Sequence, residues 1–176
     1  MKRTDPETDA NGCSPIAIRP YKAEDAATLV DVFRAAVRGI ASQDYSAAQL
    51  RAWAPDQIEV EAFARGRAGN ATWIAEVSGR VAGFGDLEPD GHVDMLYVHP
   101  DFKRRGVGRA LIEHIETQAR ELEIRRLYTE ASITARPVFE RQGFRVIVAQ
   151  TVVVRGESLT NFRMEKRLAP SPGSTP

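Results

Sequence analysis

The chain is poor in cysteine and has no long apolar run. Its 176 residues include one cysteine, Cys13, so an internal disulfide framework is excluded and a reducing compartment is favoured. No apolar stretch approaches the ~20 residues that a membrane-spanning helix requires. The start, MKRTDPETDANG, lacks the apolar segment of a secretory signal. We therefore expect a cytoplasmic protein without a membrane partner.

The chain also lacks an excess of charge of either sign. Its 24 Lys and Arg balance its 24 Asp and Glu, which gives a net charge of zero and a pI near 6.9. Such a chain has no overall attraction for nucleic acid, so we expect no nucleic-acid partner and look for local clusters of charge instead.

Length and composition favour one globular domain. The sequence is 43% hydrophobic and 27% charged, which suits a single domain with a full core. Polar, turn-rich residues fill 1–14, and small residues and proline fill 169–176, so we expect two mobile tails around a domain at 15–168.

One stretch, His92 to Ile115, combines a strand, a turn, a glycine loop and a helix. Residues 93–98 are mostly apolar and include β-branched and aromatic types, which predicts a strand that ends at Pro100. From Gly106 the apolar residues recur at helical spacing, with Val107, Leu111, Ile115 and Leu122 on one face. We therefore expect a helix that begins near Gly106.

The start of this predicted helix is suited to an anion. Gly106 and Gly108 have no Cβ, so a ligand can approach the free N–H groups of the first turn. The helix dipole and four nearby cations, at 103, 104, 105 and 109, add positive charge. A diphosphate fits this pattern; the alternative is a tight turn beside a solvated basic face. The loop lacks both the Gly-Lys-Ser/Thr ending of a P-loop and the third glycine of a dinucleotide fingerprint.

Two segments resemble the GNAT superfamily of N-acetyltransferases. VDMLYVHPDFKRRGVGRALIEHI resembles its acyl-CoA motif, (Arg/Gln)-x-x-Gly-x-(Gly/Ala), with Lys103 as a departure at the first position. EASITARPVFERQGF, from Glu130 to Phe144, resembles the later strand and helix of the family. The likeness spans roughly 16–166 and implies acetyl-CoA as co-substrate, with no metal. The residues that it assigns to acetyl-CoA are Leu96, Tyr97, Val98, Lys103, Arg104, Arg105, Gly106, Val107, Gly108, Arg109, Ser132 and Phe139.

The implied reaction requires a neutral amine, and the central strand offers candidate bases. An amine with a pKa of ~10.4 needs roughly 4–5 kcal/mol to be neutral at pH 7, whereas an α-amine near ~7.7 needs about 1. His92 and Asp94 share one face of the predicted strand, where several GNAT enzymes place the base or its water relay. We rank Asp94 first. The alternatives are a solvated His92 beside the Asp-Gly turn and a structural Asp94.

The motif lacks its usual proton donor for the leaving thiolate in this chain. Many relatives have a tyrosine just before the Glu of the second segment, but this chain has Phe139. Ser132 stands where many relatives have an asparagine, and it is the nearest alternative hydroxyl. Phe139 therefore also favours a second hypothesis, a non-catalytic acyl-CoA-binding sensor.

Acceptor contacts are assigned from the helical region that borders the acceptor pocket in GNAT proteins. Tyr45 and Trp53 are our candidates there, with Glu88 near a strand end; the alternative for the two aromatic residues is a place in the core. The acceptor itself, a small-molecule or peptide amine, is not identified by the sequence, and a homodimer is compatible with it.

The expected elements give an α/β (α+β) fold with a mixed, mostly antiparallel sheet flanked by helices. Strands are expected at 16–19, 71–77, 80–87, 93–98, 126–131, 144–154 and 158–166, and helices at 23–39, 106–122 and 135–142. Two capping boxes, Ser46 with Gln49 and Asp56 with Glu59, predict two further helix starts.

Overall fold

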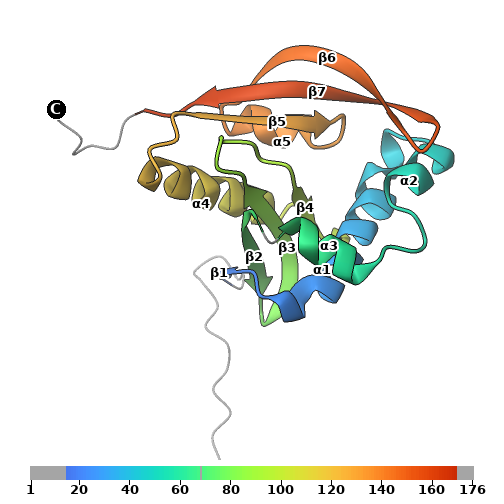
Figure 1. Cartoon of the computed structure of the whole chain (residues 1–176), viewed down its shortest axis with the longest axis horizontal. Helices are drawn as coiled ribbons and strands as arrows, with labels where there is room; N and C mark the ends of the chain where they lie inside the picture. Colours follow the sequence, from blue (N-terminus) through green and yellow to red (C-terminus); the bar gives the residue numbers. More distant parts are fainter. Residues whose placement is uncertain (1–14, 68, 170–176) are drawn as a thin grey trace, which may run out of the picture.

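A computed structural model describes residues 15–67 and 69–169, so Cys13 and nearly all of the two expected tails lie outside the described residues. Two antiparallel sheets form the framework (Figure 1). The first has the order β1-β2-β3-β4 and the second the order β5-β7-β6. The strands are β1 (Ile16–Pro20), β2 (Ala71–Val77), β3 (Arg80–Leu87), β4 (Leu96–Val98), β5 (Arg126–Ser132), β6 (Arg145–Val154) and β7 (Glu157–Arg167).

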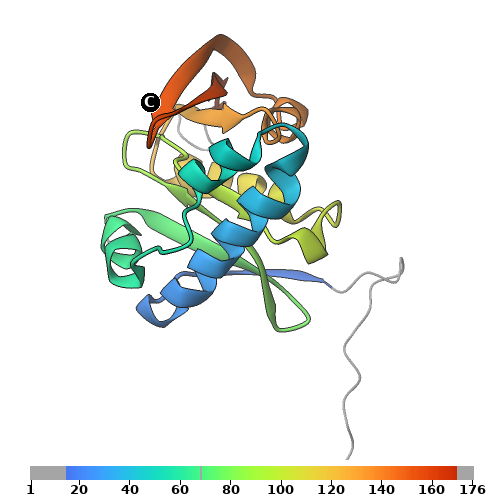
Figure 2. The same ribbon diagram turned by 90° about the vertical axis from the view of Figure 1, so that its right-hand side faces the viewer.

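Helices cover both faces of the four-stranded sheet. Figure 2 shows α1 lying across one face, with α2 above it toward the second sheet, while α4 packs against the opposite face. The helices are α1 (Ala26–Ala35), α2 (Ala47–Trp53), α3 (Val60–Arg67), α4 (Val107–Glu121) and α5 (Arg136–Arg141). A π-helical turn, η2 (Ala36–Ile40), extends α1, and short 3-10 turns are η1 (Ala23–Asp25), η3 (Ala41–Gln43) and η4 (Pro100–Phe102). No helix in this described part is long and apolar enough to cross a bilayer.

The two sheets meet at one point and separate beyond it. His92 and Tyr128 form a single parallel bridge, in which Val93 N–H donates to Tyr128 O and Tyr128 N–H donates to Gly91 O. Past this joint, β4 is the edge of one sheet and β5 the edge of the other. The expected mixed, mostly antiparallel arrangement is confirmed, and its parallel part is confined to this joint among the described strands.

The central strand is shorter than predicted. We expected a strand over 93–98, but regular pairing covers only Leu96–Val98. The reason is Asp86, whose backbone N–H donates to Met95 O while its side-chain Oδ1 accepts the Met95 N–H at 2.8 Å. A carboxylate thus takes the place of a ladder carbonyl, and the strand cannot continue regularly past this point.

Other differences concern helix ends. Leu122, expected on the apolar face of α4, is 61% exposed because the helix ends at Glu121. The capping box of Ser46 and Gln49 is confirmed. The one expected at Asp56 is wrong: α3 begins only at Val60, and the Asp56 carboxylate pairs instead with Arg38 at 2.7 Å.

Candidate active site

A cleft opens where the two sheets separate. Its cavity, about 1010 Å³, lies between β4 and the loop before α4 on one side, and the end of β5 with α5 on the other. The end of α1 closes it, through Ala36, Val37 and Ile40 of the π-helical turn. Extra residues in such a turn widen a helix, and they recur at functional sites.

The free edge of β4 faces this cleft. His99 N–H donates to Ala82 O, and Tyr97 is paired with Phe84. Because hydrogen-bonded pairs alternate in an antiparallel ladder, Tyr97 uses its backbone groups within the sheet, whereas those of Leu96 and Val98 point toward the cleft. Of Tyr97 and Val98, both assigned to acetyl-CoA by the resemblance, Val98 thus has a backbone N–H that points toward the cleft and could polarise a carbonyl there.

The start of α4 forms one end of the cleft. Gly106 is the N-cap with a φ of 81°, in the left-handed region that favours glycine, and the helix begins at Val107 as predicted. A Cβ on Gly108 would lie 3.5 Å from Val138 and 3.7 Å from Val98, at ordinary contact distance. Both glycines line the cavity, so the first-turn N–H groups are accessible to an anion there.

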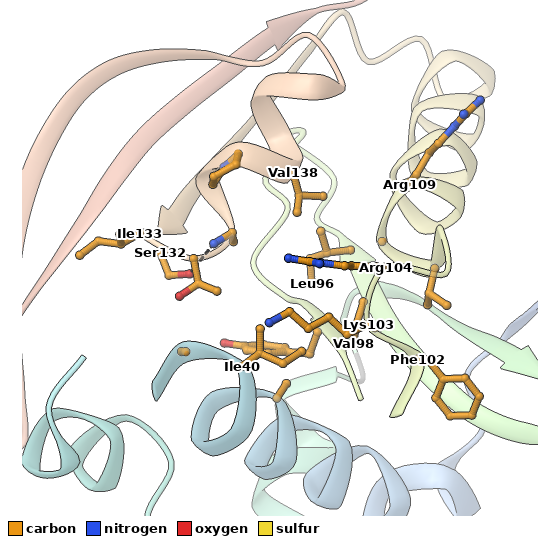
Figure 3. A pocket seen from close by; sticks show the side chains of 18 of the residues that line it. Ile40, Leu96, Val98, Phe102, Lys103, Arg104, Arg109, Ser132, Ile133 and Val138 are labelled. Carbon is orange, nitrogen blue, oxygen red and sulfur yellow. Dashed lines mark hydrogen bonds between the residues drawn. The ribbon is translucent and has the colours of Figure 1, made fainter. Parts of the chain in front are cut away.

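Three cations that line the cavity have no counter-charge. Within the described ranges, no ion pair or hydrogen bond joins the side chain of Lys103, Arg104 or Arg141 to another residue. Figure 3 shows Lys103 and Arg104 extending across the cleft, whereas Arg109 points away. Arg109 pairs with Glu113 at 2.7 Å, and Arg105 lies over the Phe102 ring. The residues thus fit a polyanion such as the phosphates of CoA.

We expect Arg104→Ala and Arg141→Ala each to weaken acetyl-CoA binding roughly fivefold, since an exposed charge pair contributes up to ~1 kcal/mol. Titration calorimetry at several salt concentrations measures this, and the dependence on salt should become less steep. Arg136→Ala is the matched control, because Arg136 on the same helix pairs with Glu140 at 2.7 Å. Equal losses in all three variants would contradict a specific role for the unpaired cations.

Ser132 and Phe139 occupy different environments. Ser132 lines the cavity, and its Oγ accepts the Ala135 N–H at 3.0 Å, which leaves its hydroxyl proton free to donate. Phe139 is 2% exposed and packs against Phe144 in the core, so it does not line the described part of the cavity. Its neighbours Val138 and Arg141 do.

His92 is held between two carboxylates. Its Nδ1 lies 3.1 Å from Glu88 and its Nε2 lies 2.7 Å from Glu130, while its ring stacks on Tyr128 at 4.8 Å. Burial lowers the pKa of His92, but the hydrogen bonds to Glu130 and Glu88 outweigh it and the pKa is raised. The alternative of a solvated His92 is wrong, because its side chain is only 18% exposed.

Asp94 and His92 have different partners. Both precede the regular strand, which begins at Leu96, so the face that we expected them to share remains a prediction. Arg67 of α3 donates to its Oδ2 at 3.2 Å, and its side chain is 40% exposed. Neither Asp94 nor His92 belongs to the described lining of the cavity.

The predicted acceptor residues are divided between the core and this polar region. The Tyr45 hydroxyl donates to Thr160 O at 2.6 Å and accepts the Ile133 N–H at 2.9 Å, so it ties the turn before α2 to the second sheet. Trp53 packs between Tyr45 and Tyr97. Burial raises the pKa of Tyr97, and a hydrogen bond with Trp53 opposes this. Glu88 pairs with His92 and accepts from Asn70.

Sequence reasoning missed the cleft side of α5 and the charged partner of Asp94. Val138, Arg141 and Gln142 share one helical face at spacings of three and four, a signal that was present in the sequence. Arg67 gave no such signal, because its partners are distant in the sequence.

Comparisons with known proteins agree with this geometry. The acetyltransferase (GNAT) domain family matches residues 41–167. The uncharacterized N-acetyltransferase YafP of Escherichia coli is 38% identical over 149 residues, which cover 85% of this chain and 94% of YafP. A GCN5-related N-acetyltransferase structure from Rhodopseudomonas palustris is 39% identical, with a TM-score of 0.84 over 89% of this chain and 98% of that one. PaiA N-acetyltransferase from Thermoplasma acidophilum, solved with coenzyme A, shares the fold at 19% identity, with a TM-score of 0.69 over 88% and 99% of the two chains.

Proposed function

Because the chain belongs to the GNAT family of acetyl-CoA-dependent N-acetyltransferases, we propose that it moves the acetyl group directly onto a primary amine of a small molecule or a peptide. The observation that carries this proposal is the free edge of β4 in a cleft whose one end has a helix N-terminus and three unpaired cations. Acetyl-CoA supplies an activated thioester, and its phosphates suit the positively charged end of the cleft.

Direct transfer requires no acylated side chain. Among the described residues that line the cavity there is no cysteine, and the Ser132 oxygen already accepts a backbone N–H. The amine nitrogen therefore attacks the thioester carbon itself: a C–N bond forms, the C–S bond breaks, and CoA leaves as a thiolate. A thiol pKa near ~8.5 makes this leaving group tolerable, with its proton coming from water or the Ser132 hydroxyl.

Asp94 is the proposed acceptor of the amine proton, directly or through a water. Its carboxylate is accessible, and only its Oδ2 has a hydrogen-bond partner among the described residues. His92 is less suited to this role, because a raised pKa between two carboxylates keeps the ring protonated to higher pH. A protonated imidazole has no lone pair to accept a proton.

Free-thiol release with acetyl-CoA and a panel of amines, peptides and aminoglycosides tests the function. We expect release with at least one primary amine, and Asp94→Asn to lower turnover roughly 10²-fold with unchanged acetyl-CoA affinity. His92→Gln should retain the acidic limb of the pH–rate profile. Loss of that limb would make His92 the base.

The sensor hypothesis predicts a different result in the same assay. Binding of acetyl-CoA without thiol release for any amine on a broad panel would favour it. Phe139→Tyr tests whether a tyrosine at this position would help an enzyme: because Phe139 is 2% exposed and packs against Phe144, we expect turnover to remain unchanged.

A further inference from the structure

A buried ion pair, Arg67 with Asp86, lies directly behind Asp94. Arg67 Nη1 donates to Asp86 Oδ2 at 2.8 Å, while its Nη2 donates to Asp94 Oδ2 at 3.2 Å. The exposed fractions of the side chains are 8% for Arg67, 0% for Asp86 and 40% for Asp94. One guanidinium is thus shared between an inaccessible carboxylate and an accessible one.

Asp86 fixes the backbone of the same segment. Its Oδ1 accepts the Met95 N–H at 2.8 Å, and its own N–H donates to Met95 O at 3.1 Å. Asp86 therefore holds Asp94 in two ways, through the peptide that follows it and through the arginine that contacts its side chain. Asn70 adds a third donor, from Nδ2 to Asp86 Oδ2 at 3.2 Å.

We propose that Arg67 and Asp86 are positioning residues that orient the Asp94 carboxylate toward the acceptor amine; this rests on the proposed function, in which Asp94 takes up the amine proton. The two residues act through Asp94 and do not touch acetyl-CoA. A planar guanidinium suits this task, because its fork directs two N–H groups to two carboxylates at fixed angles.

Because burying a charged pair costs free energy, we infer that the Arg67–Asp86 ion pair serves more than stability. Removing two charges from water is expensive, and well-packed apolar residues often stabilise such a position equally well. Arg67 even leaves its Nε buried without a hydrogen-bond partner among the described residues. An apolar pair would avoid both costs, but it could not orient a carboxylate.

Tyr97, which lines the cavity, is influenced by the charges of this network. Burial is the main cause of the raised pKa of Tyr97, and the charges of Asp94 and Asp86 raise it further while Arg67 lowers it. Two further titratable groups are linked to the pair: Tyr21, which precedes η1 and is influenced by the charge of Arg67, and Glu88, which accepts from the same Asn70 amide as Asp86.

The test compares Arg67→Lys, Arg67→Met and Asp86→Asn by kcat, by KM for each substrate and by thermal unfolding. We expect Arg67→Met to lower kcat at least ~10-fold with unchanged KM for acetyl-CoA. Arg67→Lys should restore kcat in part, since one ammonium cannot bond both carboxylates as the fork does.

Lys166→Met is the matched control. Lys166 pairs with Glu116, which is 8% exposed, on α4, so this variant also breaks a partly buried pair but away from Asp94. A loss of thermal stability like that of the control, with kcat and both KM values unchanged, would reduce Arg67 to a structural role. If Arg67→Met does not fold, the kcat and KM values of Arg67→Lys and Asp86→Asn decide.

A double variant separates this inference from the proposed function. Arg67→Lys should cost nothing further in the Asp94→Asn background, because two residues that act through one carboxylate are not additive. Wild-type kinetics for Asp94→Asn would overturn the role of Asp94 itself. A large effect of Asp94→Asn with none for Arg67 and Asp86 variants would overturn the positioning alone.

Discussion

Replacing Gly108 by leucine is expected to abolish measurable acetyl-CoA binding while the fold is retained. Gly108 lies in the first turn of α4, and its Cα faces Val138 and Val98 across the cleft. A Cβ fits at 3.5 and 3.7 Å from these neighbours, but the further carbons of leucine would occupy the space in which an anion approaches the backbone N–H groups. We expect affinity to fall by at least ~10²-fold, or about 2.7 kcal/mol.

Gly108→Ala is the graded control for this prediction. Alanine adds only the Cβ at ordinary contact distance, so the loss of affinity should be much smaller and thermal unfolding should be unchanged in both variants. Calorimetry and thermal unfolding with and without acetyl-CoA measure the two effects. Unaltered affinity in Gly108→Leu would show that the loop before α4 is not the anion site.

The second large effect is expected from substituting Gly91, at the joint between the two sheets, and it is a loss of stability. Gly91 has a φ of 94°, and an added Cβ would lie 2.1 Å from the carbonyl oxygen of Arg126 and 3.0 Å from Ile124. The segment cannot move away, because Tyr128 N–H donates to Gly91 O at 3.0 Å. We expect Gly91→Ala to lower the free energy of unfolding by about 2–5 kcal/mol, from left-handed strain and overpacking together.

Gly79→Ala isolates the strain from the clash. Gly79 also has a positive φ, of 73°, but a Cβ there meets no atom within 4 Å among the described residues. Gly79→Ala should therefore lower the free energy of unfolding by roughly 1–2 kcal/mol, from strain alone. Urea unfolding of Gly79→Ala and Gly91→Ala measures the two losses, and their difference gives the contribution of the clash. Equal losses would contradict the view that close approach at Gly91 joins the sheets.

The sequence by itself determined the elements whose signals are local. The start of α4 at Gly106, the hairpin turn at Ser78-Gly79 and the capping box of Ser46 with Gln49 depend on residues within a few positions of one another. The order of the predicted strands and helices, together with the two segments that resemble GNAT motifs, was also sufficient to predict the GNAT fold. The matching family model and the similarity to YafP confirm the family.

Only the tertiary structure decided how the site is assembled, because its contacts join residues far apart in the chain. Asp86 on the neighbouring strand binds the Met95 N–H through its carboxylate, so the regular central strand covers only Leu96–Val98. Glu130 reaches His92 across the joint and raises its pKa, and Arg67 reaches Asp94 from a helix. Local propensity carries no information about such pairings, which depend on the packing of sheets and helices as a whole.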